Sequence, residues 1–243
     1  MKTFNVYNNK NQAVRDAFEM LAANIYIQKT DKKIKKIVVT SHNPGEGKTS
    51  LAIGLSVAMA NSGWRVLLID ADMRKPVAAK RLSEDTQPGL SDYLTGRIDL
   101  KDIIRETNIT NFYFVSCGSD ILNPIGLLSS ARFEEIMQKL HEAYDFVLFD
   151  TPALASVVDG AMVASKVDAS LLIVKMGSTK LPDLKRAKEQ LQNFNSCILG
   201  VVLNKVKKRD YKLHYGSYDY FFKSERFFKN KKAGHIKLSN RVK

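Results

Sequence analysis

The sequence contains few cysteines and no long hydrophobic run. Two cysteines, Cys117 and Cys197, in 243 residues provide neither a disulfide framework nor the paired spacing of a zinc site. The longest apolar run, residues 51–60, is too short to span a bilayer. The N-terminal residues are polar and lack the apolar core of a signal peptide. These absences predict a single domain in a reducing, cytoplasmic setting.

Acidic residues are scarce only at the C-terminal end of the chain. The formal net charge is +13, and residues 205–243 hold 13 of the 38 Lys and Arg against Asp210, Asp219 and Glu225. The rest of the chain is nearly balanced. The basic character therefore belongs to a C-terminal tail, and we expect no nucleic-acid partner for the folded part.

The chain is organised around residues 36–50, KIVVTSHNPGEGKTS. An apolar, β-branched run ends in a turn-rich loop, and a long apolar helix starts at the Gly-Lys-Thr. Such a loop directs backbone N–H groups and a positive helix N-terminus at one anion. The pattern predicts a P-loop rather than an ordinary βα turn, although His42 stands where the general motif has glycine. The residues expected to bind nucleotide are Pro44, Gly45, Glu46, Gly47, Lys48, Thr49 and Ser50.

Two further predicted strands end in aspartates. Strand 65–69 leads into Asp70 and Asp72, whose carboxylates share a face because residues two apart on a strand do so. Two carboxylates this close repel unless a cation lies between them, and Mg²⁺ with a phosphate supplies one. Strand 145–149 ends in Asp150, the Walker B pattern, in which the carboxylate holds Mg²⁺. A solvated acidic turn is the alternative for Asp70 and Asp72.

Apolar strands alternate with helices along the remaining chain, and this pattern indicates a parallel sheet covered on both faces. We therefore predict an α/β fold with a doubly wound, mostly parallel sheet. Residues 76–108 are expected to form a helical excursion with an amphipathic piece at 99–106, and Asp159 is expected to cap helix 160–166. The other predicted strands are 37–39, 112–116, 169–175 and 197–203, and the other predicted helices are 11–28, 48–62, 128–143 and 182–194.

The chain divides into three parts in this interpretation: an N-terminal helix and charged hinge (1–35), a P-loop domain (36–204) and the basic tail (205–243). The N-terminal helix packs on its own domain or on a neighbouring subunit, and its periodicity does not distinguish the two. Its expected apolar stripe consists of Val14, Phe18, Leu21 and Ile25.

The last predicted strand ends at Asn204. Ligands of parallel sheets lie at the carboxyl ends of the strands, so Asn204 is a candidate adenine contact, or else a turn cap. The tail leaves the sheet near this edge, and its r.m.s. span of roughly 30 Å, from about 5–6 Å × √n, reaches its own site or a neighbour's. Its tyrosines include Tyr211, Tyr215, Tyr218 and Tyr220, followed by phenylalanines interleaved with Lys and Arg.

These motifs together resemble those of one family. SHNPGEGKTS, LLIDADMRKP and FVLFDTP are similar to the Walker A, Walker A′ and Walker B motifs of bacterial tyrosine kinases, the BY-kinases. GLSDYLTG, NPIGLLSS and ILGVVLNKVK also resemble segments of that family. The resemblance is to the separate cytoplasmic kinases that regulate capsule or exopolysaccharide synthesis. It implies a protein-tyrosine kinase that uses ATP and Mg²⁺ and phosphorylates its C-terminal tyrosine cluster, here Tyr211, Tyr215, Tyr218 and Tyr220.

The resemblance also implies roles for single residues. Asp70 is the candidate base or a water-linked metal partner, because a tyrosine hydroxyl with a pKa near 10 gives up its proton only as the P–O bond forms. Arg74 steadies the phosphates or braces the acidic loop. The implied catalytic residues are Lys48, Asp70, Asp72 and Asp150, and the implied metal ligands are Thr49, Asp72 and Asp150.

The implied partners are a transmembrane activator, which holds the kinase at the inner face of the membrane, and further copies of the chain. Ring contacts in the family use the pattern E-x-x-R-x-x-R-T-N. Both arginines are absent here, which counts against the usual ring. The tail is a candidate anchor to anionic lipid, at about 1 kcal/mol per basic residue near the surface, or a solvated basic tail. The aligned residues are Asp16, Glu19, Ala22, Ala23 and Asn24.

Two other interpretations use the same fold. A MinD/ParA-type switch ATPase carries a second loop lysine five residues before the P-loop lysine, and Asn43 stands there in this chain. A nucleotide-binding scaffold of a polysaccharide-export complex would keep the fold without the activity. We rank this second alternative last because the candidate catalytic residues are all present.

Overall fold

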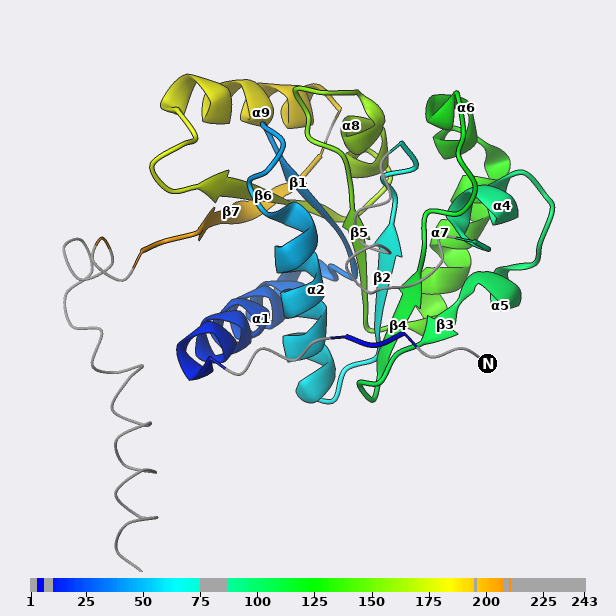
Figure 1. Cartoon of the computed structure of the whole chain (residues 1–243), viewed down its shortest axis with the longest axis horizontal. Helices are drawn as coiled ribbons and strands as arrows, with labels where there is room; N and C mark the ends of the chain where they lie inside the picture. The colour runs from blue at the N-terminus through cyan, green and yellow to red at the C-terminus, as the bar shows by residue number, and fades with distance from the viewer. Residues whose placement is uncertain (1–3, 7–10, 75–86, 195, 208–209, 211–243) are drawn as a thin grey trace, which may run out of the picture.

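The computed structural model describes residues 4–6, 11–74, 87–194, 196–207 and 210. These residues form a seven-stranded sheet in the order β3-β4-β2-β5-β1-β6-β7 (Figure 1). The short β3 pairs antiparallel with β4, and the other described pairings are parallel. The predicted α/β, doubly wound fold is confirmed. The strands are β1 Lys36–Ser41, β2 Val66–Asp70, β3 Arg105–Glu106, β4 Phe112–Val115, β5 Phe146–Asp150, β6 Ala169–Lys175 and β7 Ile198–Asn204.

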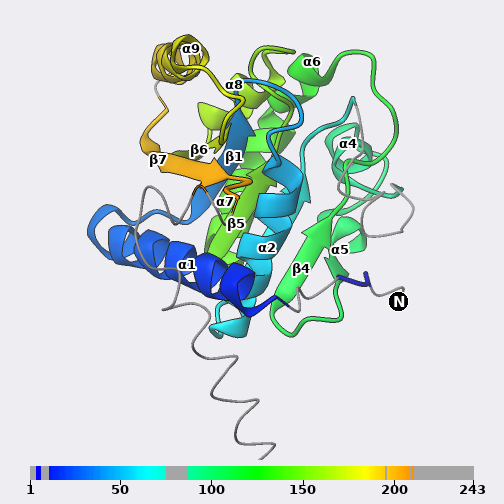
Figure 2. The same cartoon turned by 60° about the vertical axis from the view of Figure 1, so that its left-hand side comes forward.

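Helices cover both faces of this sheet. In both views α1 and α2 lie on one face, and α7, α8 and α9 lie on the other (Figures 1 and 2). Side chains of β2 alternate accordingly: Val66 and Leu68 pack with the α1–α2 layer, and Leu67 and Ile69 pack with the opposite layer. The helices are α1 Gln12–Lys32, α2 Lys48–Asn61, α4 Leu90–Leu94, α5 Leu100–Ile103, α6 Pro124–Leu128, α7 Ala131–Ala143, α8 Asp159–Ala164 and α9 Leu181–Asn193.

The central strands are enclosed between the two helical layers. Every residue of β2 and of β5 is buried. Burying one Val, Leu or Phe side chain contributes about 1.5–3 kcal/mol, so these two strands are rigid supports. Both end in aspartates, and the sheet therefore fixes the height and direction of those carboxylates.

The N-terminal helix packs on its own domain. α1 lies across α2, and a Cβ at Gly54 of α2 would collide with the ring of Phe18 (Figure 2). The predicted end at residue 28 is wrong, because α1 continues to Lys32 and ends where Lys33 adopts a left-handed conformation with φ 53°. Lys and Gln are good helix formers in solvent, so a charged segment does not by itself end a helix.

Two other predicted boundaries are wrong. The amphipathic piece 99–106 is helical only as far as Ile103, and Arg105–Glu106 instead form β3 against β4. Such a short antiparallel pairing leaves no periodic signal in the sequence. Predicted helix 128–143 starts three residues too early, because Leu128 ends the separate helix α6 and Ser130 caps α7 by accepting a hydrogen bond from the Phe133 N–H at 3.3 Å.

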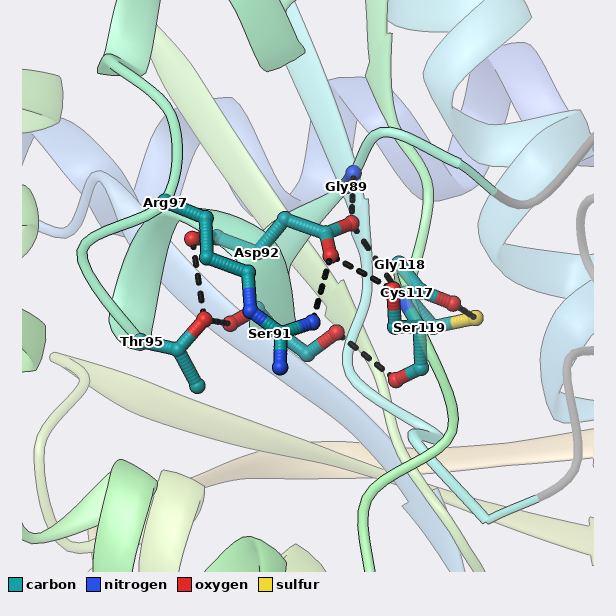
Figure 3. A network of polar contacts seen from close by, with 8 residues as sticks. All are labelled: Gly89, Ser91, Asp92, Thr95, Arg97, Cys117, Gly118 and Ser119. Atoms are coloured by element: carbon teal, nitrogen blue, oxygen red, sulfur yellow. Dashed lines mark hydrogen bonds and ion pairs between the residues drawn. The ribbon is translucent and has the colours of Figure 1, made fainter.

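A buried carboxylate fastens the loop after β4 to α4 (Figure 3). Asp92 accepts hydrogen bonds from the Gly89 N–H at 2.9 Å and from the Ser119 hydroxyl at 2.6 Å. Gly118 between them has a φ of 89° and lies so close to Ser91 that a Cβ would collide with the Ser91 hydroxyl. This network fixes the loop that begins at Cys117, beside the carboxyl end of β2.

Candidate nucleotide and metal site

The loop between β1 and α2 has the backbone shape that an anion site requires. Gly45 and Gly47 have φ values of 76° and 101°, a left-handed region that glycine enters at little cost. α2 starts at Lys48 and runs for 14 residues. The positive end of a full-length helix therefore coincides with the loop's N–H groups, as in phosphate-binding loops.

Lys48 is held at the base of this loop. Its Nζ donates a hydrogen bond to Ser41 Oγ at 3.2 Å, and Ser41 Oγ donates in turn to the Asn43 carbonyl at 2.7 Å. Burial lowers the pKa of Lys48, and the carboxylates of Asp150, Asp72 and Glu46 partly oppose that shift. The ammonium therefore lies between the loop and the acidic strand ends, where it can bind a phosphate oxygen.

The aspartates of β2 and β5 are neighbours. Asp70 and Asp150 occupy the same register position at the ends of two adjacent parallel strands, and both are buried. The Ala71 N–H donates to the Asp150 carbonyl at 2.8 Å, and the Asp72 N–H donates to Asp70 Oδ1 at 3.1 Å. The register thus brings Asp70 and Asp150 together, whereas Asp72 lies beyond the end of β2 and is tied to Asp70 by its backbone N–H.

Their negative field acts on a neighbouring thiol. The pKa of Cys117 is raised to about 12, mainly by burial and further by Asp70 and Asp72. Such an acidic environment is suited to a cation. Among the described residues, no group of three or more His, Cys, Asp or Glu is arranged to hold a metal by itself. Mg²⁺ usually takes only one or two carboxylates and completes its shell with water and substrate phosphates, so the donors Thr49, Asp72 and Asp150 fit a Mg²⁺–nucleotide complex.

Arg74 belongs to the brace around this site. Its Nε and a terminal nitrogen donate to the two carboxylate oxygens of Asp159 at 2.7 and 3.2 Å. The hydrogen bond to Asp159 raises the pKa of Arg74. Asp159 therefore does not cap α8, contrary to the prediction: it lies in the first turn and its carboxylate is used by Arg74. Of the two predicted roles of Arg74, this contact favours bracing of the loop after β2.

Comparison with known proteins places the chain in a family. Residues 34–205 match the family model described as an AAA domain. The chain is 37% identical over 210 residues to the tyrosine-protein kinase CpsD of Streptococcus pneumoniae, covering 85% of this chain and 92% of that protein. The chain belongs to the bacterial tyrosine kinase family.

Solved structures agree with this family membership. The kinase domain of Escherichia coli tyrosine kinase ETK superposes on this chain with a TM-score of 0.79 at 27% identity. The match covers 86% of this chain and 84% of the ETK chain. The chimerical protein CapA2B2 gives 0.77 at 28%, covering 86% and 96%. The septum site-determining protein MinD from Pyrococcus horikoshii, complexed with Mg-ADP, gives 0.61 at 26%, covering 72% and 73%.

Contacts distant in sequence also hold the P-loop of this kinase, and sequence reasoning missed most of them. Thr179, in the loop after β6, donates a hydrogen bond to Glu46, whose other carboxylate oxygen accepts from the Asn43 N–H at 3.2 Å. Glu46 therefore shapes the loop with its side chain. Thr179 carries no motif, and only the fold brings it to position 46.

The end of β7 rests on the same loop. The Asn204 amide donates to the Glu46 carbonyl at 2.8 Å, and Lys205 Nζ donates to the Gly45 carbonyl at 3.0 Å. Asn204 is thus at the nucleotide edge, as predicted, and braces the loop there. Its contact with adenine stays a prediction. The role of Lys205 was missed because a lysine at the start of a basic tail carries no distinguishing signal.

Asp183, in the first turn of α9, was also missed. It accepts a hydrogen bond from the Asn43 amide at 3.3 Å and lies 3.8 Å from His42 Nε2. Asn43 therefore directs its side chain toward α9, and His42 fits the loop in place of the motif's glycine.

Several expectations concern residues outside the described part of the chain. Tyr211, Tyr215, Tyr218 and Tyr220 are among them, so their role as phosphoacceptors stays a prediction, and the same holds for lipid binding by the tail. Pro44 and Ser50 lie exposed beside the loop, and Thr49 is half-buried. Within the described residues no helix combines the length and the apolar character that a membrane span needs.

Proposed function

We propose that this bacterial tyrosine kinase transfers the γ-phosphate of ATP to tyrosines of its own tail and thereby regulates capsule or exopolysaccharide synthesis. The observation that carries this function is the in-register pair Asp70 and Asp150 beside Lys48 at the start of α2. The CpsD relative of S. pneumoniae bears the name of a tyrosine-protein kinase and is matched over most of its length.

The loop residues act chiefly by positioning and by neutralising charge. Lys48 and the loop N–H groups would bind the β- and γ-phosphates and stabilise negative charge that spreads over the transferred phosphoryl group. Mg²⁺ held by Thr49, Asp72 and Asp150 would add further positive charge there. Removal of one such donor typically slows an enzyme about 100- to 1,000-fold.

Asp70 is the residue we assign to the tyrosine proton. It is buried, and the Asp72 N–H donates to one of its oxygens. Burial and this hydrogen bond hold the Asp70 carboxylate in place. An ordinary tyrosine has a pKa near 10, so its hydroxyl stays protonated until the bond to phosphorus forms. A carboxylate within reach then accepts the proton as the leaving ADP departs.

The three-part division of the chain belongs to the same proposal, with an N-terminal helix and hinge in 1–35, a kinase domain in 36–204 and a tail in 205–243. The tail supplies the acceptor tyrosines. A transmembrane activator, implied by the family, would bring this kinase to the membrane.

Phosphate mapping tests the activity directly. Purified protein is incubated with ATP and Mg²⁺, with and without the cytoplasmic segment of its transmembrane activator, and phosphotyrosine is located by mass spectrometry. We expect phosphate within residues 211–220 and a loss of about 100-fold or more in Lys48→Met. Lys36→Met is the matched control, because Lys36 pairs with Asp168 at the opposite end of β1.

The outcomes separate the candidate functions. ATP hydrolysis without phosphotyrosine would favour a MinD-like switch ATPase, and neither product would favour a scaffold. Asn43 counts against the switch, since it stands where such proteins carry a second loop lysine and its amide donates to Asp183. A Mg²⁺ titration then divides the aspartates: higher Mg²⁺ should partly restore Asp150→Asn, a lost metal ligand, and should not restore Asp70→Asn, a lost base.

A further inference from the structure

An apolar hollow lies between α9 and β7, on the face of the sheet opposite to α1. Its volume is about 470 Å³, within the range of ligand pockets. Leu172, Leu184, Ile198 and Val201 line it, together with the polar side chains of Lys188 and Gln192. The hollow is separate from the nucleotide site, and nothing in the kinase chemistry uses it.

The edge strand leaves this hollow open. The pairing of β6 with β7 shifts between Ser170 and Leu171, which pair with Ile198 and Gly200. After that bulge Val201 and Leu203 share one face of the strand and are 51% and 40% exposed. β7 is the last strand in the sheet order, and in the described part of the chain both side chains stay partly open to solvent.

The chain that follows β7 offers a matching ligand. Residues 220–223 are Tyr-Phe-Phe-Lys, and the aromatic pair Phe221–Phe222 is the first phenylalanine pair after the sheet. We propose that Phe221 and Phe222 of the same chain dock in the hollow between α9 and β7 and so anchor the tail on the kinase domain.

The length of the connecting chain suits this contact. Val201 lies three residues before the end of β7, about 10 Å back along the strand. Phe221 lies 17 residues beyond Asn204, and a flexible segment of that length has an r.m.s. span of roughly 20–25 Å. The first aromatic pair is therefore within reach of the hollow. The loop from β7 to this pair is shorter than the loop to the second pair, Phe227–Phe228, so its closure costs less entropy.

The charge of the lining distinguishes this contact from binding of the basic tail to an acidic surface. Lys188 lies in the lining, so the basic residues of the tail gain no attraction there. The contact must come from apolar burial, with each aromatic ring removing its surface from water. Docking should therefore persist at high salt, whereas a basic tail bound to anionic lipid would be released.

Cys197 provides a built-in probe of the hollow. It is exposed and lies between Ser196 and Ile198, both of which line the hollow, whereas Cys117 is buried at 2% exposure. A benzophenone-maleimide attached to Cys197 of the full-length protein, without ATP, is irradiated and the cross-linked peptides are sequenced. We expect cross-links to residues 220–223, with a yield that raised NaCl does not lower.

Matched variants test which side chains make the contact. Phe221→Ala/Phe222→Ala should lower the yield roughly tenfold or more, as expected for lost aromatic burial, and Phe227→Ala/Phe228→Ala should leave it unchanged. Val201→Lys should lower the yield as well. Met20→Lys on α1 is its control, because Met20 has the same 51% exposure on the other face of the sheet.

The alternative occupants are outcomes that would overturn the proposal. Protein made as an equal mixture of ¹⁵N-labelled and unlabelled chains distinguishes copies: cross-links that join light to heavy peptides mean that a second chain fills the hollow. Cross-links confined to the kinase domain, or to residues 227–228, also contradict the assignment. Because the experiment contains no nucleotide, docking is tested independently of whether the chain is a kinase.

Discussion

Lys48 is the residue in which burial and charge act most directly on function. An ammonium in a partly desolvated loop loses its proton at a lower pH than an ordinary lysine does. Burial accordingly lowers the pKa of Lys48 from the usual 10.5. The carboxylates of Asp150, Asp72 and Glu46 act in the opposite direction and retain the proton. The protonated form binds phosphate, so these acidic neighbours help ATP binding through Lys48 as well as through a metal.

A pH titration tests this coupling. ATP affinity should fall as pH rises through the lowered pKa of Lys48, because the charged form is lost. Removing the strongest opposing carboxylate lowers that pKa further, so in Asp150→Asn the fall should begin at a lower pH. The measurement is the dissociation constant of fluorescent ATP between about pH 7 and about pH 10. It is made in EDTA, so that loss of metal binding by Asp150→Asn does not affect the result.

The control variant is Asp168→Asn, whose carboxylate accepts from the Lys35 and Lys36 N–H groups at the far end of β1. Its pH profile should overlay that of the unmodified protein. Identical profiles for Asp150→Asn and the unmodified protein would show that Asp150 does not act on Lys48.

Single residues were predictable where a motif meets a strand end. The placement of Lys48, Asp70 and Asp150 at one edge of the sheet was predictable because strand, loop and helix occur in the order that brings such residues there. Thr179 was not, because its contact with Glu46 joins two loops from distant parts of the chain. The side chain that braces a loop leaves no local pattern, so only the packed structure reveals it.

At the scale of elements, the P-loop is shaped by its two left-handed glycines, and their surroundings differ. A Cβ at Gly45 would meet nothing within 4 Å, whereas a Cβ at Gly47 would collide with the Asn204 amide. The backbone strain of a non-glycine residue in this region is roughly 1–2 kcal/mol at either position. Only Gly47→Ala adds a collision with the end of β7.

We therefore expect Gly47→Ala to lower both thermal stability and ATP affinity more than Gly45→Ala. Adding Asn204→Ala should restore part of the loss in Gly47→Ala, although Asn204→Ala alone loses a hydrogen bond worth about 1 kcal/mol. Urea unfolding and ATP titration of the four members of this cycle measure the coupling. Effects that add within about 0.5 kcal/mol would show that Gly47 and Asn204 do not interact.

Most elements that carry a clear apolar pattern were predictable from the sequence, although the end of α1 was not. Near-continuous apolar runs such as β6 were found with their bounds, and α9 was found to within one residue. β3 has two residues and no period, and it exists because β4 offers an edge to pair with. The break between α6 and α7 did have a signal, because Ser130 is of the residue type that caps a helix N-terminus.

At the scale of the whole molecule, the path of the chain connects the tail to the site that would act on it. β7 ends on the P-loop, where Asn204 donates to the Glu46 carbonyl. Tyr211 follows seven residues later, an r.m.s. span of roughly 15 Å. Ala22 of α1 is buried within its own domain, and Glu19 is exposed.

This geometry leads to a kinetic expectation, on the basis of the proposed kinase activity. The first phosphorylation should occur within one chain, because Tyr211 follows only seven residues after Asn204 and a connection this short gives an effective concentration in the millimolar range at the chain's own site. The initial rate per chain should then stay constant when the protein is diluted about a hundredfold, far below that concentration.

A full-length Lys48→Met chain mixed with active protein should stay unphosphorylated, and mass tags on the two chains allow their tyrosines to be read separately. A rate that rises in proportion to protein concentration, with phosphate on the Lys48→Met chain, would instead mean that a second copy presents its tail. The two chains would then be in contact without the arginines of the family pattern.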